Sequence, residues 1–200
     1  MVRLFHFSED PGIALFTPRT VRIPVARPAG QGWLNGPLAW AIDDAHDFLY
    51  LFPRECPRIL IWPTARTSVE DREQWFGHTP RRAIAFIEEG WLERLRTTTV
   101  HRYDLPTATF EDLGDVGMRV SRAPVKPLGA EAVADLPQAL EARNVELRVA
   151  PTLTPLRKIW ATSLHASGLR LRNAQGWGDP RWPHSPPQAG SPAGRPRSRE

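Results

Sequence analysis

The hydrophobic positions of this chain fall into short runs that are separated by proline, glycine and acidic residues. Runs of about five apolar or alternating residues bounded by such breakers are typical of β-strands. The pattern predicts strands at residues 3–7, 38–42, 58–62, 82–87, 98–105, 117–121, 145–149 and 169–171. Between them it predicts helices at residues 43–52, 67–76, 89–95, 135–144 and 154–164.

Two of these helices carry clear start signals. Thr67 and Glu70 have the spacing of a capping box, in which Thr67 is the N-cap, and Gly77 fits the position after the helix. Asp135 as N-cap places Pro137 in the first turn, where a missing N–H costs little. The order of elements predicts an α+β fold, with a mixed, largely antiparallel sheet and short flanking helices.

The helix at 154–164 is predicted from Thr154 as its cap and Pro155 in its first turn. An apolar face is spaced as a helix requires. Its members are Leu156, Ile159, Trp160, Ser163 and Leu164.

The length and the proline and glycine content predict one domain and one tail. Residues 1–172 fit a single globular domain. Residues 173–200 contain six prolines and four glycines and no apolar periodicity, so we expect a disordered tail with Trp177 and Trp182 exposed. The proline- and glycine-rich segment 17–37 is predicted to be a long loop, and loops of that length often serve function.

Charge and cysteine content restrict the partners. The net charge is +4, of which the segment 173–200 carries +2, and arginines are interspersed with acids in the body. Nucleic acid is therefore not the expected partner, although it is not excluded. Cys56 is the only cysteine, and neither a signal peptide nor an apolar run of about 20 residues is found. We expect a cytoplasmic protein without membrane contact; the oligomeric state stays open.

The most suggestive chemistry lies on the first two predicted strands. Alternation puts His6 and Ser8 on the same face of the first strand, and an acidic turn follows. Trp40 in the second strand is flanked by Ala39 and Ala41, which leaves room for a planar ring to stack. Together the two strands could line a nucleotide-sized cleft. The alternative is a core histidine and a core tryptophan.

Other candidates have plain alternatives. Asp43, His46 and Asp47 have the spacing and the residue types of a metal site, but they also suit a helix cap and a polar helix face, so no metal is expected. Arg122 could hold a phosphate, or lie on the surface. Cys56, followed by proline, fits a small buried residue. The chain lacks the P-loop, G-x-G-x-x-G, G-x-S-x-G and H-E-x-x-H motifs.

Five segments together resemble an uncharacterised bacterial domain family. They are LFHFSEDPGI at 4–13, LAWAIDDAHDFLYLFPRECPRI at 38–59, WLERLRTT at 91–98, VSRAPVKPL at 120–128 and GLRLRNA at 168–174. A more distant likeness is to the ADP-ribosyltransferase-like superfamily, including RNA 2′-phosphotransferases, whose first strand bears H-x-T or H-x-S, here residues 6–8.

That second likeness implies NAD as a cofactor and a set of site residues. It implies that His6 binds the ribose and that Trp40, where tyrosine is more usual, stacks on nicotinamide. The cofactor-binding set is then His6, Phe7, Ser8, Trp40, Asp43 and Tyr50. The superfamily's glutamate on a later strand has no clear counterpart, and the alternatives are Asp104, Glu111 and the pair Ser121–Arg122. We take His6 and Arg122 as the catalytic candidates.

Two functions follow as hypotheses. The first is an ADP-ribosyltransferase-like protein that binds NAD or a related nucleotide in a cleft formed by His6 and Trp40, with ADP-ribosyl or phosphate transfer as its reaction. The second is a non-enzymatic binding or interaction domain that keeps the scaffold without a complete catalytic set. An acid within reach of His6 and Trp40 favours the first; its absence favours the second.

Overall fold

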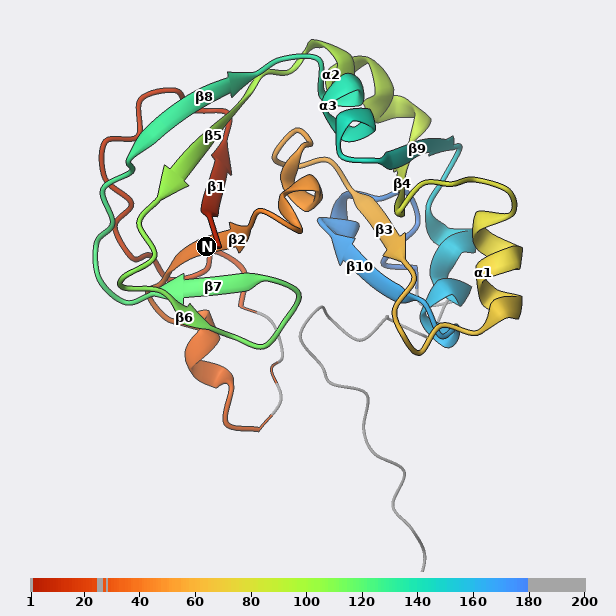
Figure 1. The fold of residues 1–200 in the computed structure, drawn as a ribbon, viewed down its shortest axis with the longest axis horizontal. Helices are drawn as coiled ribbons and strands as arrows, with labels where there is room; N and C mark the ends of the chain where they lie inside the picture. Colours follow the sequence, from red (N-terminus) through yellow and green to blue (C-terminus); the bar gives the residue numbers. More distant parts are fainter. Residues whose placement is uncertain (1, 25–26, 28, 180–200) are drawn as a thin grey trace, which may run out of the picture.

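Two β-sheets lie side by side in the computed structural model, which describes residues 2–24, 27 and 29–179 (Figure 1). The larger sheet is antiparallel throughout. Its strand order is β6 (Glu111–Asp112), β7 (Met118–Ser121), β2 (Ala39–Asp43), β1 (Leu4–Ser8), β5 (Val100–Leu105) and β8 (Gly129–Val133). The smaller sheet has the order β10 (His165–Leu169), β3 (Arg58–Trp62), β4 (Ala83–Glu88) and β9 (Val145–Ala150), and β4–β9 is a parallel pair.

Short helices join and cover these strands. The α-helices are α1 (Val69–Phe76), α2 (Leu92–Thr97) and α3 (Leu136–Ala142). The 3₁₀ segments are η1 (Gly32–Asn35), η2 (Asp47–Tyr50), η3 (Glu89–Trp91), η4 (Thr154–Ala161) and η5 (Leu171–Asn173). The predicted α+β single domain is thus confirmed. The predicted single sheet is wrong in one respect, because the strands divide into two sheets that are mostly antiparallel.

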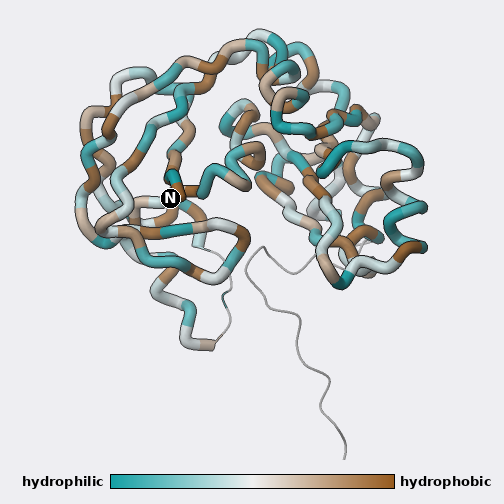
Figure 2. Tube along the Cα trace, viewed as in Figure 1, coloured by the Kyte–Doolittle hydropathy of each residue, from teal (hydrophilic) through white to brown (hydrophobic). Residues whose placement is uncertain are grey.

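The two largest clusters of buried apolar residues lie on the two faces of the smaller sheet, and two smaller clusters belong to the larger sheet. Strands β3 and β4 are continuous apolar runs that are buried almost throughout, as expected of strands covered on both sides. Alternate residues such as Leu60 and Ala85 face the larger sheet and pack with Phe5 and Ile42. The other face packs against α1, η4 and the segment around Ala174. Along the tube in Figure 2, α1 is mostly hydrophilic, and of its residues only Trp75 and Phe76 are buried.

Several local predictions need correction. Ser68, and not Thr67, caps α1: its Oγ accepts from the N–H of Asp71, while the Thr67 hydroxyl donates to the Ser163 carbonyl. Residues 43–52 contain only the single turn η2: Asp43 Oδ1 accepts from the backbone N–H of His46, as a helix cap would, but no α-helix follows. Segment 154–164 is a 3₁₀ helix that ends at Ala161.

The helix start there also differs from the prediction. Thr154 is the first residue of η4 and not its cap, and no side-chain cap bond forms at the preceding residue, Leu153. Ser163 instead hydrogen-bonds to Asp71, and Leu164 leads directly into β10, which covers residues 165–169 instead of 169–171.

The start of the predicted tail is ordered. Ala174 is buried, and Trp177 is half-buried against Trp160, with ring centroids 6.1 Å apart. The prediction of an exposed Trp177 is therefore wrong, and the packed region extends past residue 172. Residues 180–200, including Trp182, lie outside the described part of the chain, as do residues 25, 26 and 28 of the predicted long loop.

Candidate functional site

The side chain of His6 holds β1 and β2 together where their backbone pairing ends. These strands pair only at Leu4–Asp43 and Phe5–Ile42, and beyond that point the His6 ring takes over: its Nδ1–H donates to the Trp40 carbonyl at 2.8 Å. A carbonyl can only accept, so Nδ1 must carry the proton. Burial lowers the pKa of His6, the bond to the carbonyl opposes that shift, and the charge of Arg54 adds to it. His6 is thus held as a structural donor.

The strand register separates His6 from the Trp40 side chain. Directly opposed residues of antiparallel strands share a face, and faces alternate along each strand. Since Phe5 pairs with Ile42, Trp40 lies on that face, whereas His6 lies on the other face with Leu4. The His6 ring accordingly packs against Phe16, 4.6 Å away. The two predicted cleft residues therefore do not line one cleft.

Trp40 and Tyr50 instead line a cavity between the two sheets. This inter-sheet cavity has a volume of about 290 Å³, and its lining residues come from β2, β7 and η2 on one side and from β10 on the other. Both rings are half-buried. The Tyr50 hydroxyl has the Met118 sulfur as its contact, at 3.4 Å, which is a weak acceptor. Burial raises the pKa of Tyr50, so its hydroxyl stays protonated and can donate.

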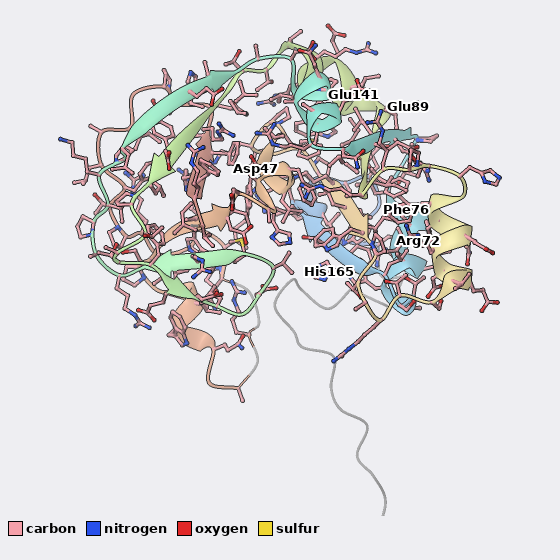
Figure 3. The ribbon with its side chains drawn as sticks, viewed as in Figure 1. Asp47, Arg72, Phe76, Glu89, Glu141 and His165 are labelled. Carbon is pink, nitrogen blue, oxygen red and sulfur yellow. The ribbon has the colours of Figure 1, made fainter. Side chains whose placement is uncertain are left out.

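Charged and polar groups complete this cavity. Arg27 lines it, and its buried Nε has no hydrogen-bond partner among the described residues. Asp115 lines it too; burial raises the pKa of this carboxyl, and the charge of Arg27 opposes the shift. Strand β10 contributes His165, which is labelled in Figure 3, and the buried Ser167. Burial, together with the nearby His46, lowers the pKa of His165, which favours a neutral ring.

Sequence reasoning missed these partners for a clear reason. Arg27 and Asp115 are in loops, and the polar residues of β10 lie more than a hundred positions from Trp40. One signal was available: His165 and Ser167 alternate with Ala166 in a short segment, which places both polar side chains on one strand face.

Asp43 organises the corner after β2 and does not line the inter-sheet cavity. Its Oδ1 accepts from both the backbone N–H and the Nδ1 of His46, at 2.9 and 2.7 Å. Gly117 passes so close that an added Cβ would lie 2.4 Å from the carboxylate, and its φ of +70° also favours glycine. Asp43 therefore positions the His46 ring.

Asp47 belongs to a different network. It is 3% exposed and lies between the sheets, where it accepts from Arg143 Nε at 2.7 Å and approaches Arg102 NH1 at 3.5 Å (Figure 3). The trio Asp43, His46 and Asp47 thus does not converge. Within the described residues, no group of three or more histidine, cysteine or acidic side chains could hold a metal ion.

The remaining predicted residues have local roles. Ser8 Oγ accepts from the N–H of Asp10 in the turn after β1. The ring of Phe7 stacks on that of Tyr50, with centroids 6.3 Å apart. Arg122 is exposed, pairs with Glu111 at 3.1 Å and covers the ring of Trp33. Of Ser8, Phe7 and Arg122, only Phe7 contacts a predicted site residue that lines the inter-sheet cavity, namely Tyr50.

Cys56 is fully buried, as expected. Burial raises the pKa of its thiol to about 12, so the thiolate needed for nucleophilic chemistry is not formed near neutral pH. The neighbouring Arg58 guanidinium is also buried, donates to the carbonyls of Leu49 and Cys56, and has its pKa lowered to about 10 by burial. These groups support the core beside Tyr50.

Comparison with protein-family models assigns the chain to a family. Residues 5–174 match the model of a family of unknown function, DUF6886. The chain belongs to this family. Comparisons with curated proteins and with solved structures found no match. The resemblance to an uncharacterised domain family is confirmed, whereas the bacterial origin and the likeness to ADP-ribosyltransferases stay predictions.

The DUF6886 match spans both sheets and every residue that lines the inter-sheet cavity. The family description gives no activity, so the function has to be argued from the geometry. Within the described part of the chain, no helix is long and apolar enough to cross a membrane.

Proposed function

We propose that this protein binds a nucleotide, NAD or a related molecule, in the inter-sheet cavity. The observation that carries the proposal is the buried Nε of Arg27, which lines the cavity and lacks a partner among the described residues. Leaving a buried charged donor unsatisfied is costly, and a phosphate oxygen would satisfy it. The cavity also has the mixed aromatic and polar lining that small-molecule sites use.

The residues that line the cavity could each bind a different part of the nucleotide. Trp40 offers a planar surface to a base or to nicotinamide. Tyr50 and His165, from opposite walls, can donate to or accept from ribose hydroxyls. Arg27 would hold phosphate. His6 has a supporting role in this arrangement, because its bond to the Trp40 carbonyl holds the strand that presents the Trp40 ring.

The cavity also contains a candidate for the acid that the sequence did not reveal. Cleavage of a nicotinamide–ribose bond passes through an oxocarbenium-like state, which a nearby carboxylate stabilises. Asp115 and Asp112 are the acids that line this cavity. Asp115 is our candidate for that role. If it does not act, the protein is the non-enzymatic binding domain of the second hypothesis.

A thermal-shift titration tests the binding. NAD, ADP-ribose and nicotinamide are added to the full chain and to the variants Arg27→Gln and Trp40→Leu, with Trp91→Phe as the matched tryptophan control. A ligand at 100 times its Kd stabilises by about 2.7 kcal/mol, a shift of a few degrees for a chain of this size. We expect this shift in the wild type and in Trp91→Phe, and its loss in the two cavity variants.

Two results would overturn or refine the proposal. Absence of a shift with all three ligands removes it. A shift that persists in Arg27→Gln and Trp40→Leu places the ligand elsewhere. Release of nicotinamide from NAD, measured by chromatography and lost in Asp115→Asn, would separate an enzyme from a binding domain.

A further inference from the structure

A second cavity, separate from the proposed nucleotide site, collects arginine side chains. Its volume is about 410 Å³, and Arg72, Arg81 and Arg82 line it together with His46, Phe48 and Trp62. We name it the arginine pocket. Arg72, labelled in Figure 3, extends from α1 beside the smaller sheet, and the other two arginines directly precede β4. None of the lining residues is acidic.

The charges of this pocket are only partly compensated. Arg81 pairs with Glu141 at 2.8 Å, and His46 is bound to Asp43. The guanidinium of Arg72 makes no hydrogen bond or ion pair with any residue that the structure describes. Arg82 makes no direct pair with a carboxylate there either; the buried Asp47 acts on it only through its charge and is itself held by Arg143. Three arginines less one glutamate leave two positive charges at the pocket.

Arg82 is held in place for a ligand. Its Nε donates to the Arg143 carbonyl at 2.8 Å, and its guanidinium carbon lies 4.6 Å from the centre of the Phe48 ring. These contacts fix the plane of the group and involve neither Nη atom. A guanidinium fixed in this way is suited to bidentate contact with an oxyanion.

The base of the pocket consists of aromatic rings that pack against one another. Trp62 stacks on His165 with centroids 4.2 Å apart and meets the Phe48 ring edge-on at 5.6 Å. Pro63 and Pro80 add further apolar lining. A ligand with an apolar part next to its anionic group would match both the charge and the walls.

We propose that the arginine pocket is a binding site for a small phosphate monoester, whose doubly charged phosphate contacts Arg72 and Arg82. A dianion matches the two uncompensated charges, and the organic part of the monoester would pack against Trp62 and the two prolines. The site is independent of the proposed nucleotide cavity: the lining residues of the two cavities do not overlap, although His165 of one stacks on Trp62 of the other.

Calorimetric titration of the full chain with phenyl phosphate, phenyl sulfate and inorganic phosphate tests this site. At pH 8 the phosphate group is a dianion, since its second pKa is about 6, whereas phenyl sulfate carries one charge and the same ring. We expect phenyl phosphate to bind about tenfold more tightly than phenyl sulfate, and more tightly than inorganic phosphate, which lacks the ring. Equal affinity for the two phenyl esters would overturn the proposal.

Variants locate the binding. Arg72→Gln should weaken phenyl phosphate binding about tenfold, as expected for a lost charge-assisted contact, and Arg72→Lys should recover part of it. Lys126→Gln removes an exposed charge between β7 and β8 and should have no effect. Similar losses in Arg72→Gln and Lys126→Gln would mean diffuse attraction to a basic surface, and would remove the site.

The two proposals can fail separately. Arg72 is exposed on α1, so we expect Arg72→Gln to keep the wild-type unfolding temperature, which confirms folding. Arg27→Gln and Trp40→Leu change the inter-sheet cavity only. If phenyl phosphate binding survives in those variants while NAD gives no shift in the wild type, the nucleotide proposal alone is removed.

Discussion

The two sheets of this protein differ in how deeply they are buried. In the smaller sheet, β4 is buried at all six positions and β3 at all but the last. In the larger sheet, β8 is exposed at four of its five positions, and β1 is buried only at its first two. The central strands of the smaller sheet are therefore the most deeply buried part of the molecule, whereas the edge strand β8 of the larger sheet lies largely in solvent.

Both cavities border the smaller sheet. Both proposed sites use the edge or the ends of the smaller sheet as one wall, through β10 and through the residues that begin β4. The opposite wall of the inter-sheet cavity comes from β2, β7 and their loops.

The largest contrast is expected between core substitutions in the two sheets. Ile84 in β4 is fully buried and pairs with Ile61, so Ile84→Ala should lower the free energy of unfolding by about 3–4 kcal/mol. Val133→Ala in the half-buried end of β8 should cost under about 1 kcal/mol. Urea unfolding followed by circular dichroism measures both. Similar losses at the two positions would contradict the difference in burial between β4 and β8.

The ion pairs of the buried Asp47 give the next largest expected effect. Asp47→Asn leaves two arginines without their buried carboxylate and should cost about 3 kcal/mol. The matched control is Glu131→Gln, which removes the exposed partner of the same Arg102 and should change stability by under about 1 kcal/mol. The same urea experiment applies. A loss below 1 kcal/mol in Asp47→Asn would show that the two sheets are not held together by these ion pairs.

A pair of glycines tests the corner at Asp43. Gly117→Ala introduces a Cβ against that carboxylate at a positive φ and should cost about 1–2 kcal/mol. Gly129→Ala, in an open position on β8 with an ordinary φ, should be close to neutral. Thermal unfolding of both variants measures the difference. Equal midpoints would mean that the corner adjusts without cost.

The smallest expected effect is the pH dependence from His6. Because the pKa of His6 is lowered in the folded protein, its contribution to stability is complete above the unfolded value of about 6.5 and is lost as the pH falls through the folded value. Between pH 7 and pH 6 we expect a loss of about 0.5 kcal/mol. His6→Asn, which keeps a donor but does not titrate, should reduce this loss. His165 contributes in the same direction and stays unchanged in that variant. An unchanged slope would contradict the role of His6.

The sequence predicts the smaller sheet best. The continuous apolar runs of β3 and β4 locate these strands to within about one residue. The exposed β8 and the two-residue β6 escape prediction, because their residues neither alternate nor cluster. Such strands form only because a neighbouring strand offers free N–H and carbonyl groups, which is a property of the assembled sheet.

The candidate site could likewise be predicted only in part. Trp40 could be identified from its type and its small neighbours, whereas Tyr50 entered the predicted set only through the resemblance to ADP-ribosyltransferases; both line the inter-sheet cavity. Grouping His6 with Trp40 required the pairing register of β1 and β2, and a shift of one residue exchanges the two faces of a strand. Arg27, Asp115 and His165 join the site only through the tertiary fold.

The chain passes back and forth between the sheets, and this has a consequence for how the protein is made. It builds β1 and β2 of one sheet, β3 and β4 of the other, returns for β5 to β8, and finishes with β9 and β10. The buried β3 receives one of its two neighbours from residues 165–169. During synthesis on the ribosome, its apolar edge therefore stays open until nearly the whole domain has emerged, and an unpaired apolar strand edge is prone to aggregation during that interval.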